Sequence, residues 1–265
     1  MQKTPSLRQS PRYPVDSVDH ALTLMEMVRD YGRVRISVAA RLLGVSVSTA
    51  HRLMAMLVYR GYAVQDASRR YIPGPALGLP PVGVPWTAEL RHRTYPHLEM
   101  LAGRLGETAN LMVRAGTEVR FLASVEGDHS VRVGDRQGVA LPAAAASGGK
   151  ALLATMDPAT VEQLYRHQAE LVGSPFDARS HTRLAAELAM IRIRGFAIND
   201  QGTEEGVGAV GVAVRDSSGA AVAGMTVSVP RDRLRTALDA GLVAELLRSR
   251  IELEADLHGF VAATW

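Results

Sequence analysis

Short hydrogen-bonding side chains gather in the stretch ISVAARLLGVSVSTAHRLMAML, residues 36–57. Its second half places apolar residues three and four positions apart, the spacing of an amphipathic helix with one face in a core. The other side of this helix carries hydroxyl, imidazole and guanidinium groups, which can bond to base edges and phosphates in a major groove. The residues predicted to contact DNA here are Ser46, Val47, Ser48, Thr49, His51 and Arg52.

Two further cations lie in a β-hairpin pattern. After Gly61 the sequence alternates with period two, passes through a polar turn at residues 66–70, and resumes at residues 71–72. The tip of this hairpin is basic, and Arg69 and Arg70 are predicted to bind phosphate or the minor groove.

Patterns for enzymatic chemistry are incomplete. Gly206, Gly208 and Gly211 match G-x-G-x-x-G, but a strand pattern follows where a dinucleotide site needs a helix, so we interpret these glycines as close sheet packing. The stretch SGGKA at residues 147–151 is no P-loop, because position 144 is Ala where a P-loop needs Gly and position 151 is Ala where it needs Ser or Thr. The chain has no cysteine, no zincin histidine pair and no Gly-x-Ser-x-Gly elbow. We therefore predict no catalytic residue, no metal site, no cofactor and no enzymatic activity.

The length and the charge distribution indicate two domains with different partners. The chain has 265 residues and a net charge of +3. Residues 1–75 hold 11 Lys and Arg against 5 Asp and Glu, whereas residues 76–265 hold 19 against 22. The basic first part suits the phosphate backbone, although a solvated face would carry the same bias. No signal peptide or membrane span is evident, so the expected location is the cytoplasm.

The elements that position these groups follow from the same periodicities. Helices are predicted at residues 18–30 and 38–43, capped by Ser17 and Ser37, and a third begins at Ser46 or Ser48. The buried faces are predicted to include Val18, Leu22 and Met56. Three helices followed by a hairpin make a winged helix-turn-helix, although an ordinary amphipathic helix pair remains an alternative for residues 36–57 taken alone.

The second half mixes strands and helices, which indicates a mixed sheet with helices on its faces. A helix is expected from Trp86 through Leu105. Strands are expected at residues 109–114, 119–126, 130–133, 196–199, 207–215 and 221–229. Helices are expected at residues 150–156, 158–166, 182–194 and 234–257.

Both halves resemble one known family. The runs SVDHALTLMEMV, AARLLGVSVSTAHRLMAMLVYRGY and RRYIPGPAL, followed by LPAAAASGGKALLA and RGFAINDQGTEEGVGAVGVAV, resemble the IclR (isocitrate lyase regulator) family of bacterial transcription factors. The resemblance covers residues 15–258 and implies a GAF-like sensor domain in the second half. It departs from the family between the domains, where Pro80, Pro81 and Pro85 should break a helix that usually helps to pair two subunits.

The resemblance also implies an effector cavity. The loop of residues 141–150 ends at a helix start whose free N–H groups suit an anion. The residues implicated are Val133, Leu141, Ser147, Gly148, Asn199, Val207, Ala209, Thr226 and Ser228. Thr226 and Ser228 have one residue between them and should share a strand face. The alternative is that their hydroxyls only bond to neighbouring backbone groups.

Three substitutions relative to the family bear on the effector. Ala144 stands where the family usually has His, Ala209 where it often has Cys, and Asn199 where Asp is frequent. The pocket should therefore be roomier or less charged. We expect an effector larger or more apolar than a two- or three-carbon oxo acid.

Together these features predict an α+β protein with an N-terminal winged helix-turn-helix and a C-terminal GAF-like α/β effector-binding domain. The predicted divisions are a disordered basic tail (1–13), the DNA-binding domain (14–75), a Pro/Gly-rich linker (76–88) and the effector domain (89–265). The predicted function is regulation of transcription through double-stranded DNA with a pseudo-palindromic operator, by a homodimer or dimer of dimers that responds to a small organic carboxylate. The alternative is an enzyme or small-molecule-binding domain fused to a winged helix that contacts proteins; repression and activation stay equally open.

Overall fold

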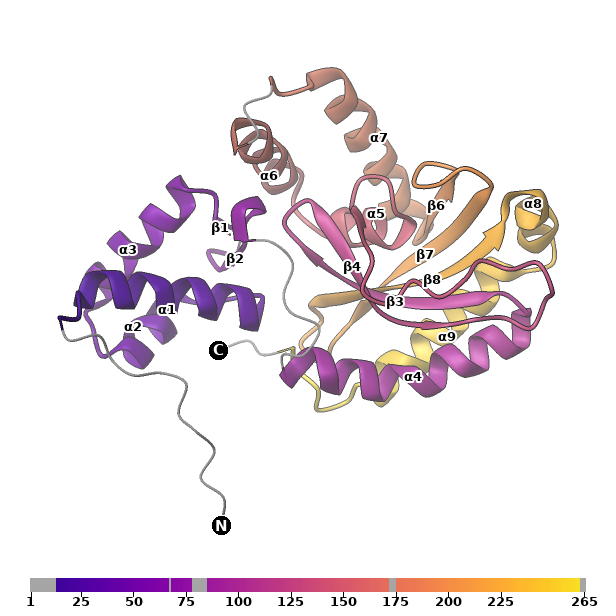
Figure 1. The fold of residues 1–265 in the computed structure, drawn as a ribbon, viewed down its shortest axis with the longest axis horizontal. Coiled ribbons are helices and arrows are strands. Elements are labelled where there is room, and N and C mark those ends of the chain that lie inside the picture. The colour runs from indigo at the N-terminus through magenta and orange to yellow at the C-terminus, as the bar shows by residue number, and fades with distance from the viewer. Residues whose placement is uncertain (1–12, 67, 78–84, 172–174, 263–265) are drawn as a thin grey trace, which may run out of the picture.

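The computed structural model describes residues 13–66, 68–77, 85–171 and 175–262. Its elements form an N-terminal helical unit with a two-stranded hairpin and a larger unit built on one six-stranded sheet (Figure 1). The α+β class and the two-part architecture are confirmed. Most of the predicted tail and linker lies outside the described residues.

The N-terminal unit contains α1 (Asp16–Tyr31), α2 (Ile36–Leu43), α3 (Val47–Tyr59), β1 (Ala63–Gln65), β2 (Tyr71–Pro73) and the short 3-10 helix η1 (Pro75–Leu77). Its core includes Leu24, Val28, Ala39, Met54 and Leu57. The predicted winged arrangement of three helices and a hairpin is therefore present.

Several local details of this unit differ from the prediction. The helices α1 and α2 begin at Asp16 and Ile36, before the predicted serine caps, and neither has a side-chain cap. Val18, Leu22 and Met56 are 53%, 50% and 55% exposed, because the helices turn Leu24, Met27 and Met54 into the core instead.

The sheet of the second unit has the order β5-β4-β3-β8-β7-β6, and every described pairing is antiparallel. Its strands are β3 (Thr108–Ala115), β4 (Glu118–Val125), β5 (Ala140–Pro142), β6 (Ala197–Asp200), β7 (Val207–Arg215) and β8 (Ala221–Pro230). The expected mixed sheet is thus wrong, since the helices here do not serve as crossovers between parallel neighbours. The strand expected at 130–133 is absent, and β5 was missed.

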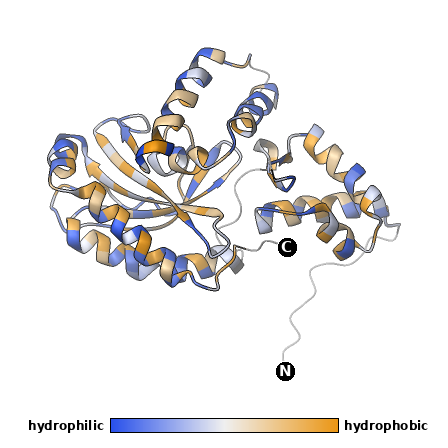
Figure 2. Cartoon of the chain, turned by 180° about the vertical axis from the view of Figure 1, so that it is seen from behind, coloured by the Kyte–Doolittle hydropathy of each residue, from blue (hydrophilic) through white to orange (hydrophobic). Residues whose placement is uncertain are grey.

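Helices cover both faces of the sheet, and Figure 2 shows the apolar strands between them. One face holds α4 (Pro85–Leu105) and α9 (Leu242–Asp256), and the other holds α5 (Ser147–Ala154), with α6 (Pro158–Leu171) and α7 (Ala178–Arg194) beyond it. The predicted last helix is two helices, α8 (Arg231–Asp239) and α9, separated at Gly241 with φ 96°. The helix α4 begins at Pro85, because a first helical position needs no intrahelical N–H bond.

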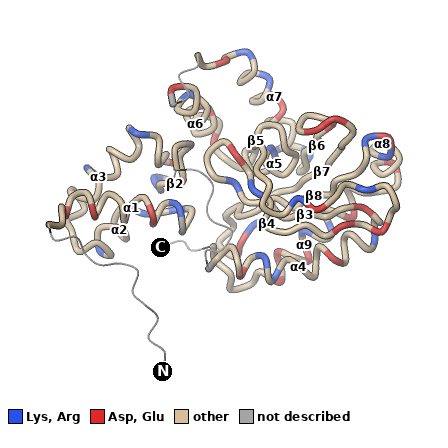
Figure 3. Tube along the Cα trace, viewed as in Figure 1, with Lys and Arg blue, Asp and Glu red and all other residues tan. Residues whose placement is uncertain are grey.

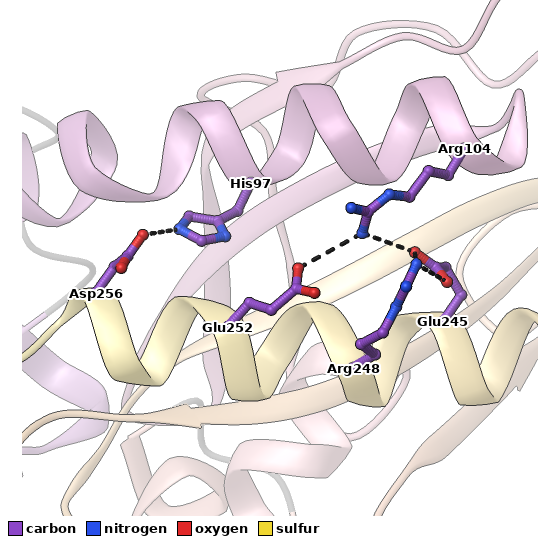
Figure 4. A network of polar contacts seen from close by, with 6 residues as sticks. All are labelled: His97, Arg104, Glu245, Arg248, Glu252 and Asp256. Atoms are coloured by element: carbon purple, nitrogen blue, oxygen red, sulfur yellow. Dashed lines mark hydrogen bonds and ion pairs between the residues drawn. The ribbon is translucent and has the colours of Figure 1, made fainter.

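Polar contacts tie α4 to α9 along one side (Figure 4). His97 Nε2 lies 2.8 Å from Asp256 Oδ2, and Arg104 Nη1 donates to Glu245 at 3.0 Å. The Arg248 guanidinium also donates to Glu245, at 2.6 Å. The two helices therefore form one layer, which supports the sheet from beneath.

Among the described helices, no single one is both long and apolar enough to cross a membrane; α2 and α3 meet that criterion only as a bent pair.

Candidate functional site

The helix pair α2 and α3 has the geometry of a helix-turn-helix. The chain bends by 111° between the two helices, within the range of roughly 90–120° seen in this motif. Gly44 makes the turn with φ 67°, and Ser46 Oγ caps α3 by accepting from the Thr49 N–H at 3.0 Å. The small residues Ala40 and Ala50 are buried. The predicted Gly44 turn and the Ser46 cap are confirmed.

The side chains predicted to meet DNA lie together on the N-terminal half of α3. Ser48, Thr49, His51 and Arg52 are exposed, and Val47 is 52% exposed. The Ser46 hydroxyl is already engaged, because it also bonds to the Thr49 hydroxyl at 2.8 Å. His51 and Arg52 therefore remain the longer polar groups on this face.

The wing holds its two arginines in different environments. Asp66 Oδ1 accepts from the Ser68 N–H and the Arg70 N–H, both at 2.9 Å, and so organises the turn. Arg69 is exposed with φ 59°, whereas the side chain of Arg70 is half-buried. The wing thus presents Arg69 more openly than Arg70. Sequence reasoning missed the role of Asp66, although Asp at the start of a turn is a known signal.

A small cavity in the second unit brings together seven of the nine residues implicated for effector binding. Its volume is about 20 Å³, roughly enough for one water molecule. The seven are Leu141, Ser147, Asn199, Val207, Ala209, Thr226 and Ser228. Val133 and Gly148 do not line it: the Val133 carbonyl accepts from Thr108, and Gly148 packs on Met112 and Thr226.

The cavity is too small in this conformation to hold an organic molecule. Met112 and Phe121, which sequence reasoning missed, line it and occupy its space. The Asn199 side chain is also engaged, since it accepts from Gly202 N–H at 2.7 Å and donates to Thr203 at 2.9 Å. Ala144 lies outside the lining, and a pocket roomier or less charged than in other members of the family stays a prediction.

A buried polar network underlies one wall of the cavity. The Asn110 Nδ2 donates to Thr226 Oγ1 at 3.4 Å and to Ser228 Oγ at 3.2 Å, while its Oδ1 accepts from Ser124 at 2.7 Å. Thr226 and Ser228 thus share one strand face, as predicted. Their hydroxyls accept from the Asn110 side chain rather than from backbone, and within the described chain neither hydroxyl has an acceptor for its own hydrogen.

Arg136 supplies the cavity with a cation that sequence reasoning missed. Its side chain is 14% exposed, and Nη2 donates to Glu204 Oε2 at 2.5 Å. Its buried Nε has no partner in the described residues. The loop between β6 and β7, which holds Glu204, is rich in acidic residues (Figure 3). No local motif marks Arg136, because it comes from an irregular loop brought to the cavity by the fold.

The start of α5 positions Ser147 at the cavity through close backbone packing. This helix begins at Ser147 rather than at Lys150, whose ammonium instead donates to Glu187 at 2.7 Å and to the Ile198 carbonyl at 2.8 Å. A Cβ on Gly211 would lie 2.6 Å from Gly148 N. The predicted close packing is confirmed for Gly211 and for Gly208, whose Cβ would lie 2.7 Å from Leu234 Cδ2, but it is wrong for Gly206, which has φ 76° and nothing within 4 Å.

Comparison with known proteins identifies the domain family of each unit. A model of the IclR helix-turn-helix domain matches residues 17–67, and a model of the bacterial transcriptional regulator IclR C-terminal domain matches residues 86–250. The chain belongs to the IclR family. It is thus a transcriptional regulator with a DNA-binding helix-turn-helix and an effector-binding C-terminal domain.

Full-length relatives resemble this IclR-family chain throughout. It is 26% identical to the HTH-type transcriptional regulator BhcR of Paracoccus denitrificans, over 90% of this chain and 86% of BhcR. It is also 26% identical to the HTH-type transcriptional regulator XynR of Escherichia coli, over 92% of this chain and 97% of XynR.

Solved structures share the fold. The Thermotoga maritima IclR has a TM-score of 0.55 at 24% identity, covering 91% of this chain and 98% of that one. The Agrobacterium tumefaciens repressor BlcR has a TM-score of 0.51 at 26% identity, covering 92% and 97%.

Proposed function

We propose that this protein is a cytoplasmic, non-enzymatic regulator that binds a pseudo-palindromic operator and changes its operator affinity when a small organic carboxylate binds the cavity beside Arg136. The active form is a homodimer or a dimer of dimers, because two-fold symmetry matches an operator with two half-sites.

The observation that carries the effector class is the set of groups around the cavity. Arg136 supplies a guanidinium, and the hydroxyls of Thr226 and Ser228 have hydrogens to donate. Ser147 adds the start of α5, where free backbone N–H groups favour an anion. Donors of this kind, without a carboxylate among the cavity residues, suit a ligand with a negative charge.

The apolar part of the cavity supports an effector with a carbon skeleton. Met112, Phe121 and Leu141 supply the apolar part of the cavity lining. Because the volume of about 20 Å³ cannot hold an organic acid, binding requires these side chains or the neighbouring loops to move. Such a movement gives the effector a way to favour one of two conformations, which is the basis of allosteric coupling.

The DNA-binding half of the proposal rests on the exposed face of α3 and the wing. Ser46, Val47, Ser48, Thr49, His51 and Arg52 are proposed to face the major groove, with Arg69 and Arg70 on the backbone or minor groove.

Fluorescence anisotropy tests the regulatory function. The full-length protein is titrated against a duplex from upstream of its own gene and against a shuffled duplex of equal composition, each at several salt concentrations. Specific regulation predicts a preference for the native duplex that survives moderate salt. Equal binding to both duplexes, with affinity lost steeply in salt, would contradict specific recognition of this DNA.

A further inference from the structure

A second cavity lies between the winged helix-turn-helix and the effector-binding domain. Its volume is about 370 Å³, within the range of small-molecule sites. One side comes from the end of α1, the wing and β2, and the other from β3, α5, the start of α6 and the turn between β7 and β8. The hairpin also packs directly on α6 here, where Val64 and Ile72 meet Leu164. An occupant would therefore contact both domains at once.

Arginines line this cavity from both domains. Arg29 and Arg33 belong to the N-terminal unit, while Arg114 lies on β3 and Arg215 at the end of β7. Guanidinium groups bind carboxylate and phosphate through paired hydrogen bonds, so a converging set of them is suited to an anion.

The acidic residues of the cavity are already engaged in local structure. Asp66 accepts from backbone and hydroxyl groups of the wing. Asp216 Oδ1 likewise accepts from Ser218 and Ala220 N–H groups, and Asp157 accepts from the Thr160 N–H at 3.1 Å. These carboxylates are therefore held in turns and caps rather than turned toward the arginines, apart from a contact of 3.6 Å between Arg33 Nε and Asp66 Oδ2.

Arg114 and Arg215 form no ion pair among the described residues, and Arg114 is the less exposed of the two. Its Nη1 donates to the Gly116 carbonyl at 2.5 Å, and within the described residues no carboxylate lies within ion-pair distance of it. Burial lowers the pKa of Arg114 to about 10; the interaction with Tyr165 opposes this shift, and repulsion from Arg33 across the domain boundary adds to it. A positive charge from each domain thus faces the same space.

We propose that this interdomain cavity binds a small organic anion with two or more negative charges, held between Arg33 of the winged domain and Arg114 of the effector-binding domain. Apolar side chains of Ile72, Trp86 and Met156 supply contacts for its carbon skeleton. Because Asp66 and Ser68 of the wing also line the cavity, the occupant fixes the wing relative to the sheet. The site is separate from the cavity beside Arg136 and gives the regulator a second chemical input.

Isothermal titration calorimetry on the full chain tests this site. Citrate and inorganic phosphate serve as probes at constant ionic strength, with chloride as the monovalent competitor. We expect saturable binding of citrate at one site per chain. Arg114→Met and Arg33→Gln should each raise its Kd at least tenfold. The matched control is Arg235→Met on α8, an exposed arginine outside the cavity, which should leave the Kd unchanged.

Two results would overturn the proposal. One is the lack of saturable binding of either probe by the wild-type chain, and the other is an unchanged Kd in a folded Arg114→Met chain. Loss of citrate binding in Arg136→Met but not in Arg114→Met would place the anion in the other cavity, which also contradicts it. If circular dichroism shows that Arg114→Met does not fold, Arg33→Gln decides, because Arg33 lies outside the sheet and its loss leaves the sheet core intact.

Discussion

The Arg136 guanidinium donates to the Glu204 carboxylate at 2.5 Å, and this ion pair joins the loop of residues 126–139 to the loop of residues 201–206 beside the small cavity proposed to bind the effector. Arg136 is the more buried partner, with 14% of its side chain exposed against 54% for Glu204. Glu204 can therefore leave toward solvent while the arginine stays at the cavity. An effector carboxylate would compete with Glu204 for the Arg136 guanidinium and replace it there.

The first prediction concerns this exchange. Arg136→Met should weaken binding of a carboxylate effector roughly tenfold to a hundredfold, because a charge-assisted hydrogen bond contributes about 1.5–3 kcal/mol. Glu204→Gln should strengthen binding several-fold, since it removes the competing carboxylate. Calorimetry with a panel of carboxylates from pyruvate to benzoate measures both. Parallel losses in the two variants would show that the ion pair supports the site rather than competing for it.

The second prediction concerns the packing that places Ser147 at the cavity. In Gly211→Ala the new methyl group would lie 2.6 Å from Gly148 N and 2.7 Å from the Ser147 carbonyl carbon. Backbone atoms have little freedom to move away, so we expect a loss of about 1–3 kcal/mol in the free energy of unfolding. Gly103→Ala in α4 is the matched control, because its methyl group meets nothing within 4 Å.

Urea unfolding followed by circular dichroism separates the two alanine variants. Gly103→Ala should stabilise the protein by about 0.5–1 kcal/mol, since alanine loses less backbone entropy in a helix. Equal stability of Gly211→Ala and the wild type would mean that α5 sits farther from β7 than the structure places it.

The sequence predicted the elements with strong local signals. The Gly44 turn, the Ser46 cap and the alternation of Thr226 with Ser228 all depend on neighbours within a few residues, and each was confirmed. The break between α8 and α9 was missed, because the helical spacing of apolar residues continues across Gly241. Local spacing does not show which face of a helix the core will select, as the exposed Val18 illustrates.

The contents of the cavities could not be predicted in the same way. Arg136 and Phe121 reach the small cavity from a loop and from β4, and no spacing in the sequence relates them to Ser147. The volume of the cavity depends on how these side chains pack, and that packing cannot be deduced from the small residues at positions 144 and 209 alone. Arg33 and Arg114 come from two domains and line one cavity, which is likewise a property of the tertiary structure.

The third prediction separates the charge of the wing from its folding. Arg69 has φ 59°, a conformation that costs a residue with a Cβ roughly 1–2 kcal/mol. Arg69→Gly should therefore keep or raise the melting temperature while it weakens DNA binding. The slope of log K against log salt should fall by about one, the loss of one phosphate contact. Arg69→Ala should show the same change in slope but a lower melting temperature than Arg69→Gly. An unchanged slope in both variants would mean that Arg69 does not contact DNA.

The last prediction concerns base reading by α3. His51 is exposed on the face of α3 that carries Ser48 and Arg52, so its imidazole is placed to bond to a base edge. His51→Ala should cost about 1–3 kcal/mol of operator binding and much less of binding to a shuffled duplex, because phosphate contacts supply most non-specific affinity. His92→Ala, an exposed histidine on α4, is the control and should change neither. Anisotropy titrations of the two duplexes at one salt concentration give the ratio of the losses. If His51→Ala weakens both duplexes equally, His51 contacts phosphate and the sequence preference comes from other residues of α3.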